Sequence, residues 1–133
     1  MEDVTEVFRR TLAAFDRRDR TTWLALHDPD YQLIPSATWP EADVIHGPEA
    51  GWDFYVGVVE PFERRRYSDN VETERVAADK ILVHQRNEVR GRASGADVEL
   101  DYWVVTTFRD GRVLRDEWFS DRAEAVAAVG MAR

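Results

Sequence analysis

A change in the spacing of apolar residues, close to Tyr67, constrains the fold of this chain more than any other feature. Before this point most apolar residues recur every three to four positions, as on one face of an α-helix. After it they alternate with polar residues, as in a β-strand that has one buried face. We therefore expect helices in the first half of the chain and a run of antiparallel strands in the second.

Three helices and one short strand are predicted before Tyr67. The first helix covers about 3–18. The second begins at Asp19 or Thr21 and ends at about His27, where Asp28-Pro29-Asp30 stops it because proline disfavours a helical residue before it. A strand at 31–34 follows. The third helix begins at Gly47-Pro48-Glu49, with proline in its first turn and an acid near the positive end of its dipole.

Four strands and a last helix are predicted after Tyr67. The strands cover 71–76, 81–92, 98–108 and 113–120, and the helix covers 121–130. Asp110-Gly111 is a typical hairpin turn between the last two strands. The pattern predicts a single α+β domain over residues 1–133, with helices on one side of an antiparallel sheet. A curved sheet of this kind leaves a concave cavity, which is a natural ligand site.

Composition excludes several classes of function. A formal net charge of −8 at pH 7 disfavours contact with a phosphate backbone, so no nucleic-acid partner is expected. The absence of cysteine removes disulfides, thiol nucleophiles and cysteine-ligated zinc. No metal-binding spacing such as H-E-x-x-H is present, and we expect neither a metal nor a cofactor. No apolar run approaches the ~20 residues of a membrane span, and the acidic N-terminus lacks a signal-peptide segment, which predicts a cytoplasmic protein.

The strand at 81–92 carries one group of candidate catalytic residues. His84, Arg86 and Glu88 alternate and therefore share one face. If that face lines the cavity, Arg86 and Glu88 would polarise a substrate oxygen and His84 would be a base. The alternative is an exposed polar row, and the core face would then consist of Ile81, Val83, Gln85 and Val89.

Asp116 is the second catalytic candidate. It shares a face of the strand at 113–120 with Leu114 and Trp118. If this face is the inner one, burial would raise the pKa of the carboxyl group, which suits a general base or acid near neutral pH. The alternative is an exposed or salt-bridged aspartate. Six aromatic residues are candidate substrate-binding residues, with core packing as the competing role: Trp23, Tyr31, Trp39, Tyr55, Tyr102 and Trp118. His27 and His46 are assigned to structure.

Several short motifs occur in a characteristic order. They are His27-Asp28-Pro29-Asp30, Trp39-Pro40-Glu41, His46-Gly47-Pro48-Glu49, Ser94-Gly95, Phe108-Arg109-Asp110-Gly111, and Asp121-Arg122-Ala123-Glu124-Ala125 with Gly130. This ordered set resembles the nuclear transport factor 2-like superfamily, and most closely its SnoaL-like, polyketide cyclase-like branch. The resemblance implies a cone-shaped α+β fold, in which a curved antiparallel sheet wraps over three N-terminal helices and a short C-terminal helix follows. In such cyclases and related isomerases an inward acid on the strand that here carries Asp116, or near the third helix, removes a proton next to a carbonyl.

A partial resemblance points to limonene-epoxide-hydrolase-like enzymes. The segment Gln85-Arg86-Asn87-Glu88-Val89 is similar to a strand of that family whose acid donates a proton to the epoxide while the arginine orients it, and Tyr31-Gln32 matches its tyrosine segment. The chain departs from the family at Leu33, where the asparagine belongs, and at Trp118, where the water-activating aspartate belongs. Asp116 lies one strand repeat earlier.

Two hypotheses for the function follow. The first is a cofactor-free acid/base enzyme, of isomerase, cyclase, dehydratase or epoxide-hydrolase type, that acts on a hydrophobic polyketide-, terpenoid- or steroid-like molecule. The second is a non-catalytic ligand-binding or dimerisation module, which should fill its cavity with aliphatic and aromatic side chains. Both allow a homodimer, because Trp103, Val105 and Phe119 would form an apolar patch on the convex face of the sheet.

Overall fold

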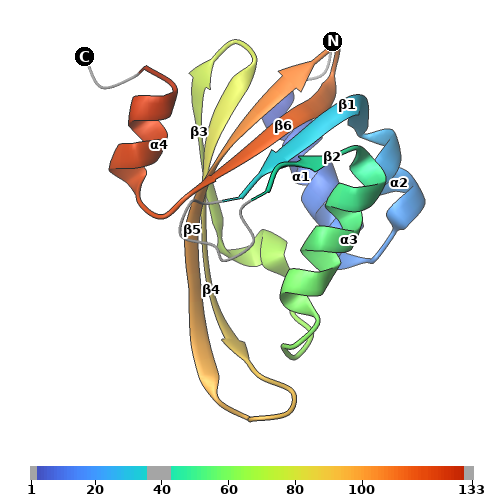
Figure 1. Cartoon of the computed structure of the whole chain (residues 1–133), viewed down its shortest axis with the longest axis vertical. Helices are drawn as coiled ribbons and strands as arrows, with labels where there is room; N and C mark the ends of the chain where they lie inside the picture. Colours follow the sequence, from blue (N-terminus) through green and yellow to red (C-terminus); the bar gives the residue numbers. More distant parts are fainter. Residues whose placement is uncertain (1–2, 36–42, 131–133) are drawn as a thin grey trace.

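The computed structural model describes residues 3–35 and 43–130 (Figure 1). The elements in chain order are α1 (Val4–Asp16), α2 (Arg20–Ala25), β1 (His27–Ile34), β2 (Ile45–His46), α3 (Pro48–Val59), the 3-10 helix η1 (Tyr67–Asn70), β3 (Val71–Ala77), β4 (Lys80–Arg90), β5 (Asp97–Arg109), β6 (Arg112–Phe119) and α4 (Arg122–Ala128). The change from helical to strand periodicity near Tyr67 is confirmed, with two short elements, β2 and η1, in addition to those predicted.

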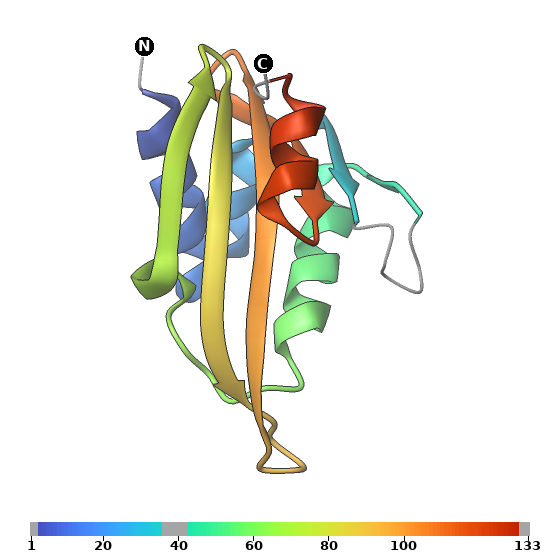
Figure 2. The same ribbon diagram turned by 90° about the vertical axis from the view of Figure 1, so that its left-hand side faces the viewer.

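The sheet has the strand order β2-β1-β6-β5-β4-β3. Helices α1, α2 and α3 cover one face of the curved sheet, and α4 lies on the other (Figures 1 and 2). This arrangement confirms the predicted α+β class, but the expectation that the helices lie on one side of the sheet is wrong, because α4 packs on the opposite face. One pairing differs from the prediction: β1 runs parallel to β6, so the sheet is mixed and not purely antiparallel.

Strand β1 is longer than expected. It begins at His27, so that α2 ends at Ala25 and Pro29 lies inside the strand and does not terminate the helix. The pairing of β1 with β6 shifts register between His27 and Gln32, and this irregularity accommodates a residue that has no N–H to donate. His27 is thereby placed beside Val113 of β6.

The outer face of the sheet is covered by α4. Ala125 and Val126 of this helix pack on Leu82 and Val105, and Val105 is only 1% exposed. Trp103 and Phe119 pack against the same cluster. The prediction that Trp103, Val105 and Phe119 form an exposed patch is therefore wrong, because Val105 is buried beneath α4 and the other two residues are half-buried.

A β-bulge in β6 decides which of its side chains face the helices. Thr107 pairs with Arg115, but the next pair is Phe108 with Val113, so Leu114 is the extra residue. Val113, Asp116 and Trp118 consequently all line the inner cavity, although strict alternation would place Val113 on the other face. On β5 no bulge intervenes before Thr107, and the predicted inner face is confirmed.

Helix α3 approaches β1 closely at Gly51. A Cβ atom on this glycine would lie 2.5 Å from Cε2 of Tyr31, a fully buried ring. We expect Gly51→Ala to destabilise the protein by about 1–3 kcal/mol, because the ring or the helix must move. Gly57, in the same helix, has no atom within 4 Å of its Cβ position, and Gly57→Ala should stabilise by about 0.5–1 kcal/mol. Urea unfolding of both variants measures the contrast, and a similar effect of the two substitutions would contradict it.

Candidate active site

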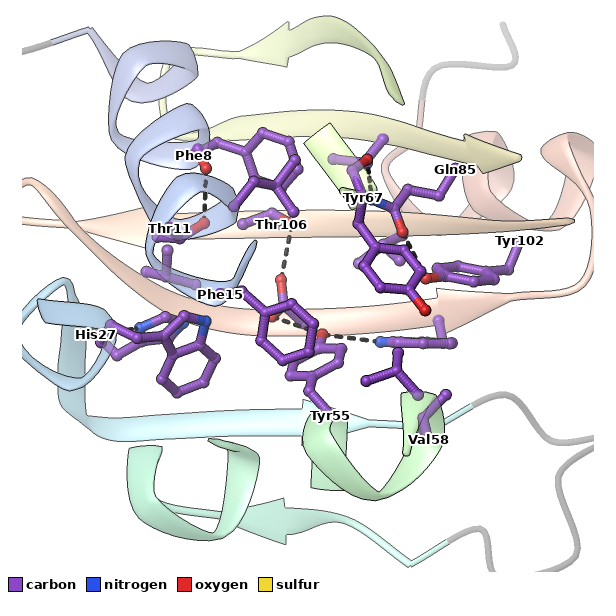
Figure 3. Close-up of a pocket in the computed structure, with 18 residues that line it drawn as sticks. Phe8, Thr11, Phe15, His27, Tyr55, Val58, Tyr67, Gln85, Tyr102 and Thr106 are labelled. Atoms are coloured by element: carbon purple, nitrogen blue, oxygen red, sulfur yellow. Dashed lines mark hydrogen bonds between the residues drawn. The ribbon is translucent and has the colours of Figure 1, made fainter. Parts of the chain in front are cut away.

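An aromatic cavity lies between the inner face of the sheet and the helices. Its volume is about 80 Å³, room for several water molecules. Most of the wall is apolar, and it includes Phe8, Phe15, Trp23, Val59, Val83 and Val104. Figure 3 shows His27 at one end of the cavity and Tyr67, Gln85 and Tyr102 at the other, with Phe15 and Tyr55 between them. An apolar cavity with a few converging polar groups is the usual form of a small-molecule site.

Asp116 is the carboxylate of this cavity. Its side chain is 93% buried and accepts three hydrogen bonds from hydroxyl groups of three other elements. Tyr31 of β1 and Tyr55 of α3 donate to Oδ2 at 2.6 and 3.0 Å. Thr106, which lies opposite Asp116 in the β5–β6 ladder, donates to Oδ1 at 2.7 Å. Four separate elements thus hold the carboxyl group in one orientation.

Burial sets the protonation of this cluster. It raises the pKa of Asp116, while the hydrogen bonds from Tyr31, Thr106 and Tyr55 oppose that rise. Burial, and then the charge of Asp116, raise the pKa of both tyrosines well above the ordinary value of 10, so both stay protonated and act as donors. A carboxylate has about four lone-pair positions, of which three are occupied here. One position on Oδ1 therefore remains for a substrate proton.

Trp118 links the Asp116 cluster to a second polar group. Its Nε1 donates to the Tyr55 hydroxyl at 3.1 Å, and its indole stacks on the Tyr102 ring at 4.3 Å between centroids. The Tyr102 hydroxyl donates to Oε1 of Gln85 at 2.5 Å, and Nε2 of Gln85 donates to the main-chain oxygen of Tyr67 at 3.3 Å. Burial raises the pKa of Tyr102, which keeps its hydroxyl neutral.

His27 also lines the cavity. Its ring stacks on Trp23 at 3.6 Å between centroids, and Nδ1 lies 2.6 Å from the main-chain oxygen of Trp23. Burial lowers the pKa of His27 to about 4, so the ring is neutral at pH 7. Because Nδ1 faces a carbonyl, it carries the proton, and Nε2 is left as an acceptor. From the sequence, His27 is predicted to have only a structural role at the end of a helix. It lines the cavity instead because β1 begins at this residue.

The structure brings together most of the predicted site residues. Asp116 lies on the inner face as hypothesised, and Trp23, Tyr55, Tyr102 and Trp118 line the same cavity. Tyr31 is fully buried behind Asp116 and contacts the carboxyl group, not the open cavity. Trp39, also predicted to bind substrate, lies outside the described residues.

The structure separates His84, Arg86 and Glu88 from Asp116. All three lie on the outer face of β4, where Arg86 and Glu88 are exposed. His84 Nε2 lies 2.7 Å from Asp101 Oδ1, and Arg86 lies 3.3 Å from Glu99. Their assignment as catalytic residues of this cavity is corrected: the core face of β4 is the alternative one, with Ile81, Val83, Gln85 and Val89 buried. The half-site similar to limonene-epoxide-hydrolase-like enzymes is therefore not formed inside the cavity.

Thr106 and Gln85 were not among the predicted site residues. Each is a polar side chain at an inward position of a strand whose other inward residues are mostly apolar. That mismatch with the alternating pattern is the signal that identifies them in the sequence, because a buried polar side chain needs a partner.

Residues 3–35 and 43–130 contain no group of three His, Cys, Asp or Glu side chains arranged to hold a metal ion. Within the same residues, no helix is long and apolar enough to cross a membrane.

Comparisons with known proteins identify one family model and several similar folds. A comparison with curated proteins gives no match. Among solved structures, similar folds include a nuclear transport factor 2-like protein from Burkholderia xenovorans LB400 (22% identity, 96% of this chain and 95% of that chain, TM-score 0.74). A proposed SnoaL-like polyketide cyclase from Jannaschia sp. CCS1 (22%, 98% and 93%, 0.71) and TerC co-crystallized with polyporic acid (18%, 97% and 99%, 0.67) are also similar. The family model of the SnoaL-like domain matches residues 8–115. The chain therefore belongs to the SnoaL-like family.

Proposed function

We propose that this protein is a cofactor-free enzyme that moves a proton at a carbon next to a carbonyl group of a hydrophobic small molecule. The observation that carries the proposal is the buried Asp116, held by three hydroxyl groups in the wall of an aromatic cavity. Burial raises the pKa of this carboxyl group, which brings it closer to the range in which an acid or base works at neutral pH. Isomerisation, aldol cyclisation and dehydration all begin with such a step.

The hydrogen bonds of Asp116 suggest how charge moves during the reaction. Asp116 takes the proton as the C–H bond breaks, and the carbonyl becomes an enolate with its charge on oxygen. Once Asp116 is protonated it no longer attracts both tyrosines, and the Tyr55 hydroxyl, the more distant donor at 3.0 Å, turns to the enolate oxygen. The hydrogen bond from Trp118 Nε1 to the Tyr55 hydroxyl keeps this hydroxyl in place. Return of the proton to another carbon gives an isomer, and attack of the enolate on a second carbonyl gives a ring.

The aromatic side chains support a substrate with a flat, apolar skeleton. Phe15, Trp23, Tyr102 and Trp118 offer flat apolar surfaces that suit a fused-ring or polyene skeleton. TerC, co-crystallized with polyporic acid, and the proposed polyketide cyclase share this fold, which supports a small aromatic or polyketide-like ligand. Epoxide opening has less support, because Arg86 and Glu88 lie outside the cavity.

Deuterium exchange tests the proposal without the natural substrate. The protein is incubated in D₂O with 1-tetralone, 2-tetralone and a β,γ-unsaturated 3-ketosteroid, with a chelator present, and exchange next to the carbonyl is followed by NMR. We expect exchange faster than in buffer for at least one ketone. Saturable binding of these ketones without exchange would overturn the proposal in favour of the ligand-binding module.

A further inference from the structure

Four arginines gather around a second pocket, next to the cavity. Arg18, Arg64, Arg65 and Arg92 line this pocket, which has a volume of about 100 Å³. It lies where the segment after α3 meets the end of β4. The contact between these two segments is fixed by the Phe62–Gly91 bridge and by the hydrogen bond from Glu63 N to Arg90 O at 2.7 Å.

None of the four arginines has a carboxylate partner in the part of the chain that the structure describes. Each donates instead to a main-chain carbonyl: Arg18 to Phe15 at 2.6 Å, Arg64 to Asp16 at 2.9 Å, Arg92 to Glu60 at 3.0 Å, and Arg65 to Glu88. By contrast, many other arginines lie within 4 Å of an acid, namely Arg9, Arg17, Arg20, Arg66, Arg75, Arg86, Arg90, Arg109, Arg115 and Arg122. A cluster of four arginines without acidic partners is unexpected in a chain of net charge −8.

The remaining groups around the pocket leave it positively charged. Glu60 and Glu63 line its exposed side, two acids against four guanidinium groups. The nearby Asp16 is occupied, because its carboxylate accepts from Tyr67 N at 2.7 Å and from Ser68 Oγ at 2.5 Å. Like charges held together destabilise a fold unless an anion neutralises them.

Two further observations indicate a missing acceptor. Nε of Arg65 is buried and has no hydrogen-bond partner, which is rare for a buried N–H group, and the side chain must move before an anion in the pocket can accept from it. Burial, and then the charge of Arg64, lower the pKa of Arg18; Tyr67 and Asp16 oppose this shift, and the charge of Arg92 adds to it. Each guanidinium has five N–H donors and uses only part of them on the main chain. An oxyanion would accept from the free donors.

The pocket and the aromatic cavity share a wall made of Val59 and Tyr67. Tyr67 lies at the end of the cavity that is opposite His27 (Figure 3). A flexible ligand that extends from the cavity into the pocket, beside Val59 and Tyr67, would have its apolar part in the cavity and its other end at the arginines. We propose that Arg18, Arg64, Arg65 and Arg92 bind the oxyanion, a carboxylate or a phosphate, of an amphipathic substrate. The inference rests on the proposed function and specifies its substrate as an acid.

Three probes that differ only in their polar end test this inference. They are 6-phenylhexan-1-ol, 6-phenylhexanoate and 6-phenylhexyl phosphate, and their Kd values are measured by isothermal titration calorimetry at pH 7. We expect one or both anions to bind at least about tenfold more tightly than the alcohol, with a preference that weakens at high salt. The tighter anion identifies the carboxylate or the phosphate. Equal Kd values for all three probes would overturn the inference.

The double variant Arg64→Gln/Arg92→Gln assigns the preference to the pocket. Both side chains are exposed, so the fold should persist, as circular dichroism would verify. We expect this variant to lose the anion preference and to keep the Kd of the alcohol. Arg112→Gln is the control, since Arg112 is exposed and lines neither cavity. Preference retained in the double variant, or lost equally in the control, would refute the assignment.

The two proposals fail separately. Asp116 does not contact the second pocket, so Asp116→Asn should leave the anion preference intact. Ketone exchange without anion preference would overturn only the oxyanion site. Anion preference without exchange on any ketone would overturn only the enzyme.

Discussion

Replacing Asp116 with Asn is expected to slow ketone exchange by about two to four orders of magnitude. An amide cannot take the substrate proton, and loss of a positioned general base typically has an effect of this size. The substitution keeps the shape of the side chain, and an amide oxygen at the place of Oδ2 still accepts from Tyr31 and Tyr55. The structural role is therefore largely preserved while the proton acceptor is lost.

The stability of Asp116→Asn separates catalysis from folding. Because burial raises the pKa of Asp116 above 3.8, the folded state favours the protonated acid. Its contribution to stability is present below pH 3.8 and is lost as the pH rises through the folded-state pKa. The variant has no such group, so its stability relative to the wild type should increase with pH across this window. Urea unfolding at a series of pH values measures the trend.

Asp53→Asn is the matched control for both measurements. Asp53 is exposed on α3, and its replacement should change neither the exchange rate nor the free energy of unfolding at neutral pH. If Asp116→Asn instead lowers stability strongly at neutral pH and activity falls only in proportion to the folded fraction, Asp116 is a structural residue.

The sequence predicts the fold better than the site, for a physical reason. Alternation on β5 has one apolar face, and the inward positions of Tyr102 and Thr106 follow from it. On β4 both faces carry polar residues, so alternation alone does not decide which face lines the cavity. In the structure the face with His84 points outward, and His84 stacks on Trp103 at 3.8 Å between ring centroids. Family resemblance favoured the other orientation, because it compares residue types and not the face they occupy.

Long-range packing decides the features that local patterns miss. From the sequence, Val105 and Trp103 are predicted to form an exposed patch on the outer face of the sheet. In the structure, α4, which lies more than fifteen residues later in the chain, packs on this face. His27 enters the cavity because β1 pairs with β6 from its first residue, a parallel contact between distant segments. The arginine cluster likewise joins residues from α1, the loop after α3 and the segment after β4. None of these contacts has a local signature in the sequence.

Acidification from pH 7 to 4 is expected to remove about 3 kcal/mol of stability through His27 alone. Burial lowers the pKa of His27 from 6.5 to about 4, so the folded state resists protonation that the unfolded chain accepts. The contribution is fully present above pH 6.5 and is lost as the pH falls towards the folded-state pKa. Each unit of pKa difference corresponds to about 1.4 kcal/mol, which gives the expected size.

The comparison that isolates this effect is between the wild type and His27→Gln. Glutamine does not titrate, whereas Asp116, which changes stability in the opposite direction, is present in both proteins and largely cancels. The free energy of unfolding of the wild type relative to the variant should be constant above pH 7 and should fall by about 3 kcal/mol by pH 4. An NMR titration of the His27 Cε1–H signal reports the pKa directly. A pH-independent difference, or a His27 signal that titrates near 6.5, would show that the ring is accessible to water and would contradict this prediction.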